Sequence, residues 1–210
     1  MRISDLAELA RDNRDQANWY DRAYAELVIV CDVTGWNIDT LAAVLAVTSP
    51  RVSVRRNIRI ALRWMNGDGL FPNVMSNIAA SLDKYLATGE ITGLKTHPFY
   101  RAIMGDAAAI VLDVHMADLF GVDQSKLASK PLRKRLESTV RRVARRVAMS
   151  PRDCQAALWT GQLRRRGRVP TMLPIVQEFA NMLAHCGFPD CGAIPQLAMA
   201  DGRYQRSLFQ

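Results

Sequence analysis

The chain has 210 residues, of which 49% are hydrophobic and 23% are charged. This composition is typical of a folded globular protein and excludes a disordered chain. The net charge is +8, from 28 Lys and Arg against 20 Asp and Glu, which favours a negatively charged partner, nucleic acid above all. No apolar run approaches the ~18 to 20 residues of a membrane span, and residues 1–14 lack the apolar core of a signal peptide. We therefore expect a cytoplasmic protein with no membrane partner.

The four cysteines, Cys31, Cys154, Cys186 and Cys191, show no repeated spacing and no CxxC pair. With only three histidines beside them, neither a structural zinc site nor an iron–sulfur cluster is expected. Reduced thiols are the ordinary state in the cytosol. We predict no metal and no cofactor.

Apolar residues recur at spacings of three and four along most of the chain, which predicts an all-α protein. The first helical region, residues 3–33, is broken near residues 12–16. Asp39 is expected to cap the next helix. The further predicted helices cover residues 39–48, 51–65, 73–87, 95–105, 113–120, 130–147, 151–163 and 171–186, and residues 187–210 are expected to be irregular.

Two short segments combine residue types that could carry chemistry. Residues 88–96 join two predicted helices through a turn with a glycine, and such a turn can present backbone N–H groups to a phosphate. Lys95 ends this turn. Asp113 follows an apolar run at the start of another predicted helix, 18 residues later. Taken singly, a helix cap and a phosphate-contacting lysine are sufficient explanations of these residues.

Together the two segments resemble the helix–hairpin–helix DNA glycosylases, which include endonuclease III and 8-oxoguanine DNA glycosylase. The similar segments are the hairpin at residues 90–95, the Leu-Asp-Val-His-Met stretch at 112–116, a buried helix and turn at 41–54, and a late helix at 153–164. The resemblance covers roughly residues 38–165. Ile91 stands where the family has its first hairpin glycine, and the four-cysteine cluster of the iron–sulfur branch is absent.

The resemblance implies a helical bundle with the active-site cleft between two interleaved lobes of a domain at residues 1–168. Residues 169–210 would form a C-terminal helix and an extension packed on it. Lys95 would attack the sugar and form a Schiff base, which permits strand scission. Asp113 would stabilise the positive charge on the sugar. The partner would be double-stranded DNA with a flipped base, and the protein would act as a monomer.

Gln155 and Trp159 lie four residues apart and therefore share one helix face. By the resemblance they would read and stack on an excised base, an oxidised purine or another modified base, in repair or in defence against phages. Phe99 would shape the same pocket. The residues expected to contact the DNA backbone are Gly93, Thr96, His115, Arg51 and Arg55.

Two interpretations in which the protein is not an enzyme stay open. Residues 40–63 fit a helix-turn-helix with basic residues on its second helix, as in a transcriptional regulator. The other is a degenerate glycosylase fold that only binds DNA or a protein, which Ile91 at the hairpin glycine position leaves open. Trp159 is also compatible with ordinary core packing.

Overall fold

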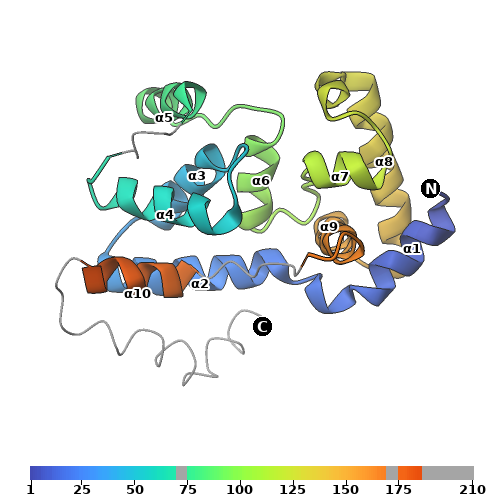
Figure 1. The fold of residues 1–210 in the computed structure, drawn as a ribbon, viewed down its shortest axis with the longest axis horizontal. Helices are drawn as coiled ribbons and strands as arrows, with labels where there is room; N and C mark the ends of the chain where they lie inside the picture. Colours follow the sequence, from blue (N-terminus) through green and yellow to red (C-terminus); the bar gives the residue numbers. More distant parts are fainter. Residues whose placement is uncertain (70–74, 169–174, 186–210) are drawn as a thin grey trace. The chain divides into compact units, whose positions relative to one another are not determined.

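The computed structural model describes residues 1–69, 75–168 and 175–185, and helices are the only regular structure in these ranges, which confirms the all-α class. No helix in this part of the chain is long and apolar enough to cross a membrane. The elements are shown in Figure 1. They are α1 (Ile3–Asp12), the 3-10 helix η1 (Arg14–Gln16), α2 (Trp19–Thr34), α3 (Ile38–Thr48), α4 (Val54–Met65), α5 (Ser76–Thr88), α6 (Thr96–Ile103), α7 (Val114–Leu119), the 3-10 helix η2 (Gln124–Ala128), α8 (Lys130–Val147), α9 (Pro151–Arg165) and α10 (Ile175–His185).

The described residues divide into two compact units. Unit 1 comprises residues 1–21 and 91–168, and unit 2 comprises residues 22–69, 75–90 and 175–185. The predicted hairpin therefore spans a unit boundary, because α5 belongs to unit 2 while Lys95 and α6 belong to unit 1.

Unit 1 is built around α9, which contacts α1, α7 and α8. Ten of its residues are buried, including Cys154, Gln155 and Gly161. A side chain at Gly161 would lie 2.7 Å from Leu9 Cδ1, so the glycine lets α1 and α9 approach closely. The shared core also takes Leu6, Leu112, Met116, Val140, Val143 and Leu158.

Unit 2 is built around α3, whose residues Leu41 to Thr48 are all buried between its neighbours α4 and α5. The buried Asn57 of α4 donates to the Leu45 carbonyl at 2.9 Å and accepts from the Thr48 hydroxyl at 2.6 Å. α10 packs against α4 and brings the buried carboxylate of Glu178 to it.

Several predicted helix ends were wrong by a few residues. Asn37, not Asp39, caps α3, through a 3.0 Å bond from the Thr40 amide, and Asp39 lies in the first turn, where its charge suits the helix dipole. The helix predicted from residue 51 begins at Val54 with Ser53 as its cap, since Arg51 has a positive φ of 57°. η2 was not predicted. Residues 73, 74, 171–174 and 186–210, with Cys186 and Cys191, lie outside the described residues.

Candidate active site

Lys95 lies at the N-terminal end of α6, and its neighbours fix its backbone. Gly93 has a φ of 119°, and a Cβ there would approach Thr96 Oγ1 to 2.5 Å, so this turn requires glycine. Thr96 Oγ1 donates to the Thr92 carbonyl at 2.5 Å. From α8, the buried Arg133 donates to the Leu94 carbonyl at 2.7 Å. The turn before Lys95 is thus held from within and from α8.

Asp113 caps α7, as the sequence predicted. Its Oδ1 accepts hydrogen bonds from the amides of His115 and Met116, each at 3.0 Å. Its Oδ2 accepts from the indole nitrogen of Trp159, on α9, at 3.1 Å. Three donors from two elements therefore set the orientation of one partly exposed carboxylate.

The amine of Lys95 is electrostatically coupled to Asp113. Burial lowers the pKa of Lys95 below its usual range, and the negative charge of Asp113 opposes this shift. Lys95 Nζ lies 5.8 Å from the centroid of the Phe99 ring, one turn later in α6. A lysine with a lowered pKa holds more of its amine in the neutral, nucleophilic form at neutral pH.

Four aromatic side chains, which we call the aromatic cluster, gather beside these two groups: Trp19, Tyr20, Phe99 and Trp159. Trp19 stands edge-on to Trp159 with ring centroids 5.6 Å apart, and its centroid is 6.3 Å from that of Phe99. The Tyr20 centroid is also 6.3 Å from that of Phe99. His115 extends the cluster, with its ring centroid 6.2 Å from that of Trp159.

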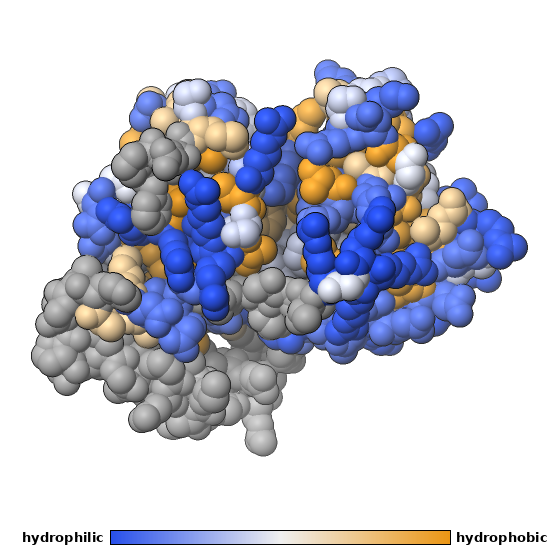
Figure 2. Space-filling model, in the orientation of Figure 1, coloured by the Kyte–Doolittle hydropathy of each residue, from blue (hydrophilic) through white to orange (hydrophobic). Residues whose placement is uncertain are grey.

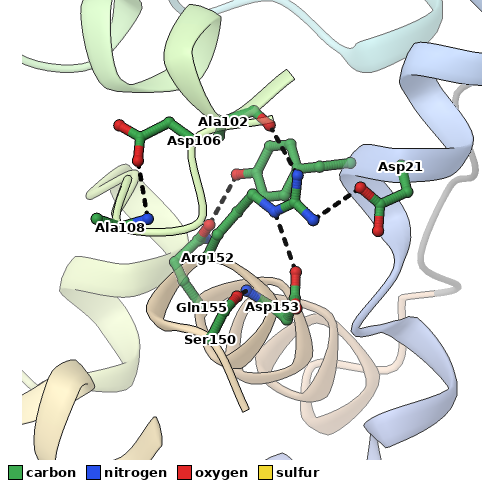
Figure 3. Close-up of polar contacts among 9 residues, drawn as sticks. Asp21, Ala102, Asp106, Ala108, Ser150, Arg152, Asp153 and Gln155 are labelled. Carbon is green, nitrogen blue, oxygen red and sulfur yellow. Dashed lines mark hydrogen bonds and ion pairs between the residues drawn. The ribbon is translucent and has the colours of Figure 1, made fainter. Parts of the chain in front are cut away.

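Gln155 contacts the aromatic cluster through Tyr20 and is almost completely buried. Its Oε1 accepts a hydrogen bond from the Tyr20 hydroxyl at 2.7 Å (Figure 3). Burial raises the pKa of Tyr20, and the nearby charge of Asp113 raises it further, so Tyr20 stays a neutral donor. One acceptor position of Gln155 is therefore occupied by Tyr20.

Arg152 joins three residues of unit 1 that come from different helices, Asp21, Ala102 and Asp153 (Figure 3). Its guanidinium bonds Asp21 Oδ1 in α2 at 2.7 Å, Asp153 Oδ1 in α9 at 3.0 Å and the Ala102 carbonyl in α6 at 3.5 Å. Asp21 follows Tyr20 directly, and Ala102 lies one turn after Phe99. The network therefore links, within unit 1, residues adjacent to Tyr20 and Phe99 of the aromatic cluster.

The structure brings six of the predicted site residues together in unit 1: Lys95, Phe99, Asp113, His115, Gln155 and Trp159. The backbone-contact candidates Gly93 and Thr96 form the adjoining turn. Arg51 and Arg55 belong to unit 2. Arg51 is exposed, and Arg55 forms an ion pair with Glu178, its Nε 2.8 Å from Oε1.

Sequence reasoning missed Trp19, Tyr20 and Arg152. Two adjacent aromatic residues shortly after the polar break near residues 12–16 were a usable signal of a buried contact. Arg152 was a second signal, because a cation in the first turn of a helix opposes the helix dipole and needs acidic partners. No group of three or more His, Cys, Asp or Glu able to hold a metal occurs in the described residues.

The comparisons with known proteins give a family and no function. A model described as a family of unknown function (DUF7178) matches residues 2–166, and the chain belongs to this family. None of the curated proteins matches the chain, and none of the solved structures does.

Proposed function

We propose that this DUF7178 protein is a DNA glycosylase that removes a damaged or modified base and then cleaves the abasic strand through Lys95. The observation that carries the proposal is the pairing of a lysine with a lowered pKa and a carboxylate held by three hydrogen bonds. The order of the two segments along the chain, which resembles the helix–hairpin–helix glycosylases, supports it. The partner is duplex DNA.

The chemistry begins at C1′ of the target nucleotide. As the bond from C1′ to the base breaks, its electron pair leaves with the base, and positive charge builds on the sugar. Asp113 faces this charge and stabilises it. The neutral amine of Lys95 forms a new bond to C1′ and gives up a proton, and the departing base takes up a proton.

Strand cleavage follows from the covalent intermediate. The sugar ring opens as the C1′–O4′ bond breaks, O4′ takes a proton, and a Schiff base forms between C1′ and Lys95. Loss of a proton from C2′ then expels the 3′ phosphate. Because burial lowers the pKa of Lys95, a larger fraction of its amine is in the free form that starts this sequence than in an exposed lysine.

The aromatic cluster is suited to a planar base taken out of the duplex. Stacking on an aromatic ring is worth about 1–3 kcal/mol per base, and Trp159 is the partly exposed member of the cluster. Gln155 can read the edge of a base only with the groups that Tyr20 leaves available. We propose a role for Gln155 in pocket shape as well as in recognition.

The alternative is a non-catalytic DNA-binding protein in which α3 and α4 act as a helix-turn-helix. Two arginines of α4, Arg55 and Arg59, form ion pairs with the buried Glu178, each through its Nε. These contacts engage two of the cations that such a recognition helix would direct to DNA. The alternative predicts sequence-specific binding without any chemistry.

Borohydride trapping tests the proposed function. The full chain is incubated with duplex oligonucleotides that carry an oxidised purine, other modified bases, an abasic site or no lesion. Borohydride reduces a Schiff base to a stable cross-link. We expect a cross-link to the sugar of the abasic duplex and of at least one duplex that carries a modified base, and none with Lys95→Ala.

Two further variants make the result specific. Lys126→Ala removes an exposed lysine of unit 1 and should cross-link like the wild type. Asp113→Asn should lose base release. Base release that persists in Asp113→Asn, or cross-linking that persists in Lys95→Ala, would overturn the assignment of those residues.

A further inference from the structure

The exposed side of α8 carries a concentration of positive charge that the proposed chemistry does not use. The helix has 18 residues and a single acid, Glu137, which pairs with Arg141 and Arg133. Six of its cations are exposed, and none of the six forms an ion pair with a described residue. They are Lys130, Lys134, Arg135, Arg142, Arg145 and Arg146.

These six cations lie on one face. At 3.6 residues per turn their positions fall within an arc of about 160°, and at 1.5 Å per residue they extend over about 24 Å. The opposite face is apolar and buried in the core of unit 1, through Leu136, Val140, Val143 and Val147. In the view of Figure 2, hydrophilic and apolar side chains both reach the surface in the region of α7 and α8.

Some of these charges oppose the stability of the helix, although Arg145 and Arg146 in the last turn suit the helix dipole. Lys130 and Lys134 lie in its first turns, where a positive charge opposes the helix dipole, and the first turn has no acid. The pairs Lys130–Lys134 and Arg142–Arg146 put like charges four residues apart, which destabilises the helix. A helix face that carries like charges so close together is expected to bind a negatively charged partner.

We propose that this face of α8 is a track for the phosphate backbone of double-stranded DNA. The inference deepens the proposed function and rests on it for the choice of DNA as the polyanion. A row of cations about 24 Å long spans several phosphates, since duplex DNA carries one charge per ~1.7 Å of axis. Because the contacts are to phosphates, binding does not depend on the base sequence.

An anionic membrane is a poorer fit to the same face. Helices that lie in a membrane surface bury apolar side chains in the lipid, whereas the apolar residues of α8 are already enclosed in unit 1. The track is also connected to the candidate active site. Arg133, on the inner side of α8, donates to the Leu94 carbonyl beside Lys95.

The test measures binding of the full chain to an unmodified duplex of about 20 base pairs by fluorescence anisotropy, over a series of salt concentrations. The track variant is Lys134→Gln/Arg142→Gln/Arg145→Gln. A matched control with the same loss of charge is Arg2→Gln/Lys84→Gln/Lys126→Gln, at exposed positions on other elements. A second control, Lys134→Arg/Arg142→Lys/Arg145→Lys, keeps the charge of the track.

Each removed phosphate contact lowers the slope of log K against log salt by about 0.9. We expect the track variant to lose roughly 2 to 3 units of slope and at least about tenfold in affinity near 0.1 M salt. Both controls should stay within about threefold of the wild type. Equal losses in the track variant and the first control, or an unchanged slope in the track variant, overturn the track.

The assay separates the track from the chemistry. If no cross-link forms on any substrate but the track variant alone loses affinity for duplex DNA, the track stands and the proposed glycosylase fails. If cross-linking succeeds and the track variant binds and reacts like the wild type, the track fails alone. Vesicles with phosphatidylserine are a further arm, and loss of vesicle binding with unchanged duplex binding overturns the choice of DNA.

Discussion

The indole nitrogen of Trp159 donates a 3.1 Å hydrogen bond to Oδ2 of Asp113. The two residues are 46 positions apart, on α9 and α7, and the bond joins a predicted pocket residue to the predicted catalytic carboxylate. Trp159 therefore does two things in the proposed site. It offers an aromatic face next to Trp19, and it fixes the carboxylate that would face the sugar.

This double role predicts the effect of Trp159→Phe. The phenylalanine keeps an aromatic ring but removes the donor to Asp113. A hydrogen bond to a charged group contributes about 1.5–3 kcal/mol, so base release should slow by roughly tenfold to a hundredfold. Single-turnover release from the best substrate of the panel measures this. Trp36→Phe, which changes a tryptophan packed against Phe179 in unit 2, is the matched control. Equal rates in the two variants would contradict the role.

The lowered pKa of Lys95 predicts a pH profile for Schiff-base formation. The neutral amine reacts, so trapping on a duplex with a preformed abasic site should rise with pH and level off below the usual range of a lysine. Asp113 opposes the shift, so Asp113→Asn should move the rising limb to lower pH. The abasic duplex needs no base release, which keeps this variant measurable. A limb that does not move in Asp113→Asn would show that the two groups are not coupled.

The lowered pKa of Lys95 also predicts how the free energy of unfolding depends on pH. Because the pKa of Lys95 is lower in the folded chain than in the unfolded chain, the folded state binds fewer protons between these two values. The free energy of unfolding should therefore rise with pH across that window, and Lys95→Met should flatten this part of the curve and be more stable at neutral pH. Urea unfolding at several pH values measures it, with Lys126→Met as the control. A less stable Lys95→Met would indicate that the charged amine is stabilising.

The ends of some helices could be predicted from local signals, and others could not. Ser150 before Pro151 marks the start of α9, and its hydroxyl accepts from the Asp153 amide at 3.1 Å. α8 has the predicted ends, residues 130 and 147. The start of α4 was misplaced because Arg51 adopts a positive φ, which its residue type does not signal.

In the candidate site, too, some residues could be predicted from local sequence and others could not. Lys95 and Asp113 stand in recognisable local contexts, so sequence alone could nominate them. The contact between Tyr20 and Gln155 joins residues 135 positions apart, and no periodicity in the chain encodes it. For the same reason the pocket role of Gln155 was proposed without Tyr20, its hydrogen-bond partner in the fold.

The close approach of α1 and α9 predicts that Gly161→Ala lowers the free energy of unfolding. The added Cβ would lie 2.7 Å from Leu9 Cδ1 and 2.7 Å from Asn13 Nδ2, so these two buried side chains would have to shift. Overpacking of this kind costs about 1–3 kcal/mol, although alanine is the better helix former. Urea unfolding measures the loss, and Ser138→Ala on the exposed side of α8 should change stability by less than about 0.5 kcal/mol. Equal stability of the two variants would mean that the Leu9 and Asn13 side chains make room for the added methyl group without cost.

The Arg152 network predicts that its loss affects the aromatic cluster as well as stability. Arg152→Met removes the shared cation from Asp21 and Asp153 and the bond to the Ala102 carbonyl. Removal of one partner of a buried ion pair costs about 3–5 kcal/mol. Both carboxylates here are partly exposed to solvent. We therefore expect the free energy of unfolding to fall by about 2 kcal/mol.

Two further measurements show whether Arg152 positions the cluster. Tryptophan fluorescence at native conditions should change in Arg152→Met, because Asp21 and Ala102 belong to the elements that carry Tyr20 and Phe99. Arg152→Lys keeps the charge without the planar fork and should recover part of the stability. In the double variant with Asp21→Asn the two losses should not add, since both remove the same ion pair. If the losses of unfolding free energy add and the fluorescence is unchanged, Arg152 stabilises α9 but does not position the aromatic cluster.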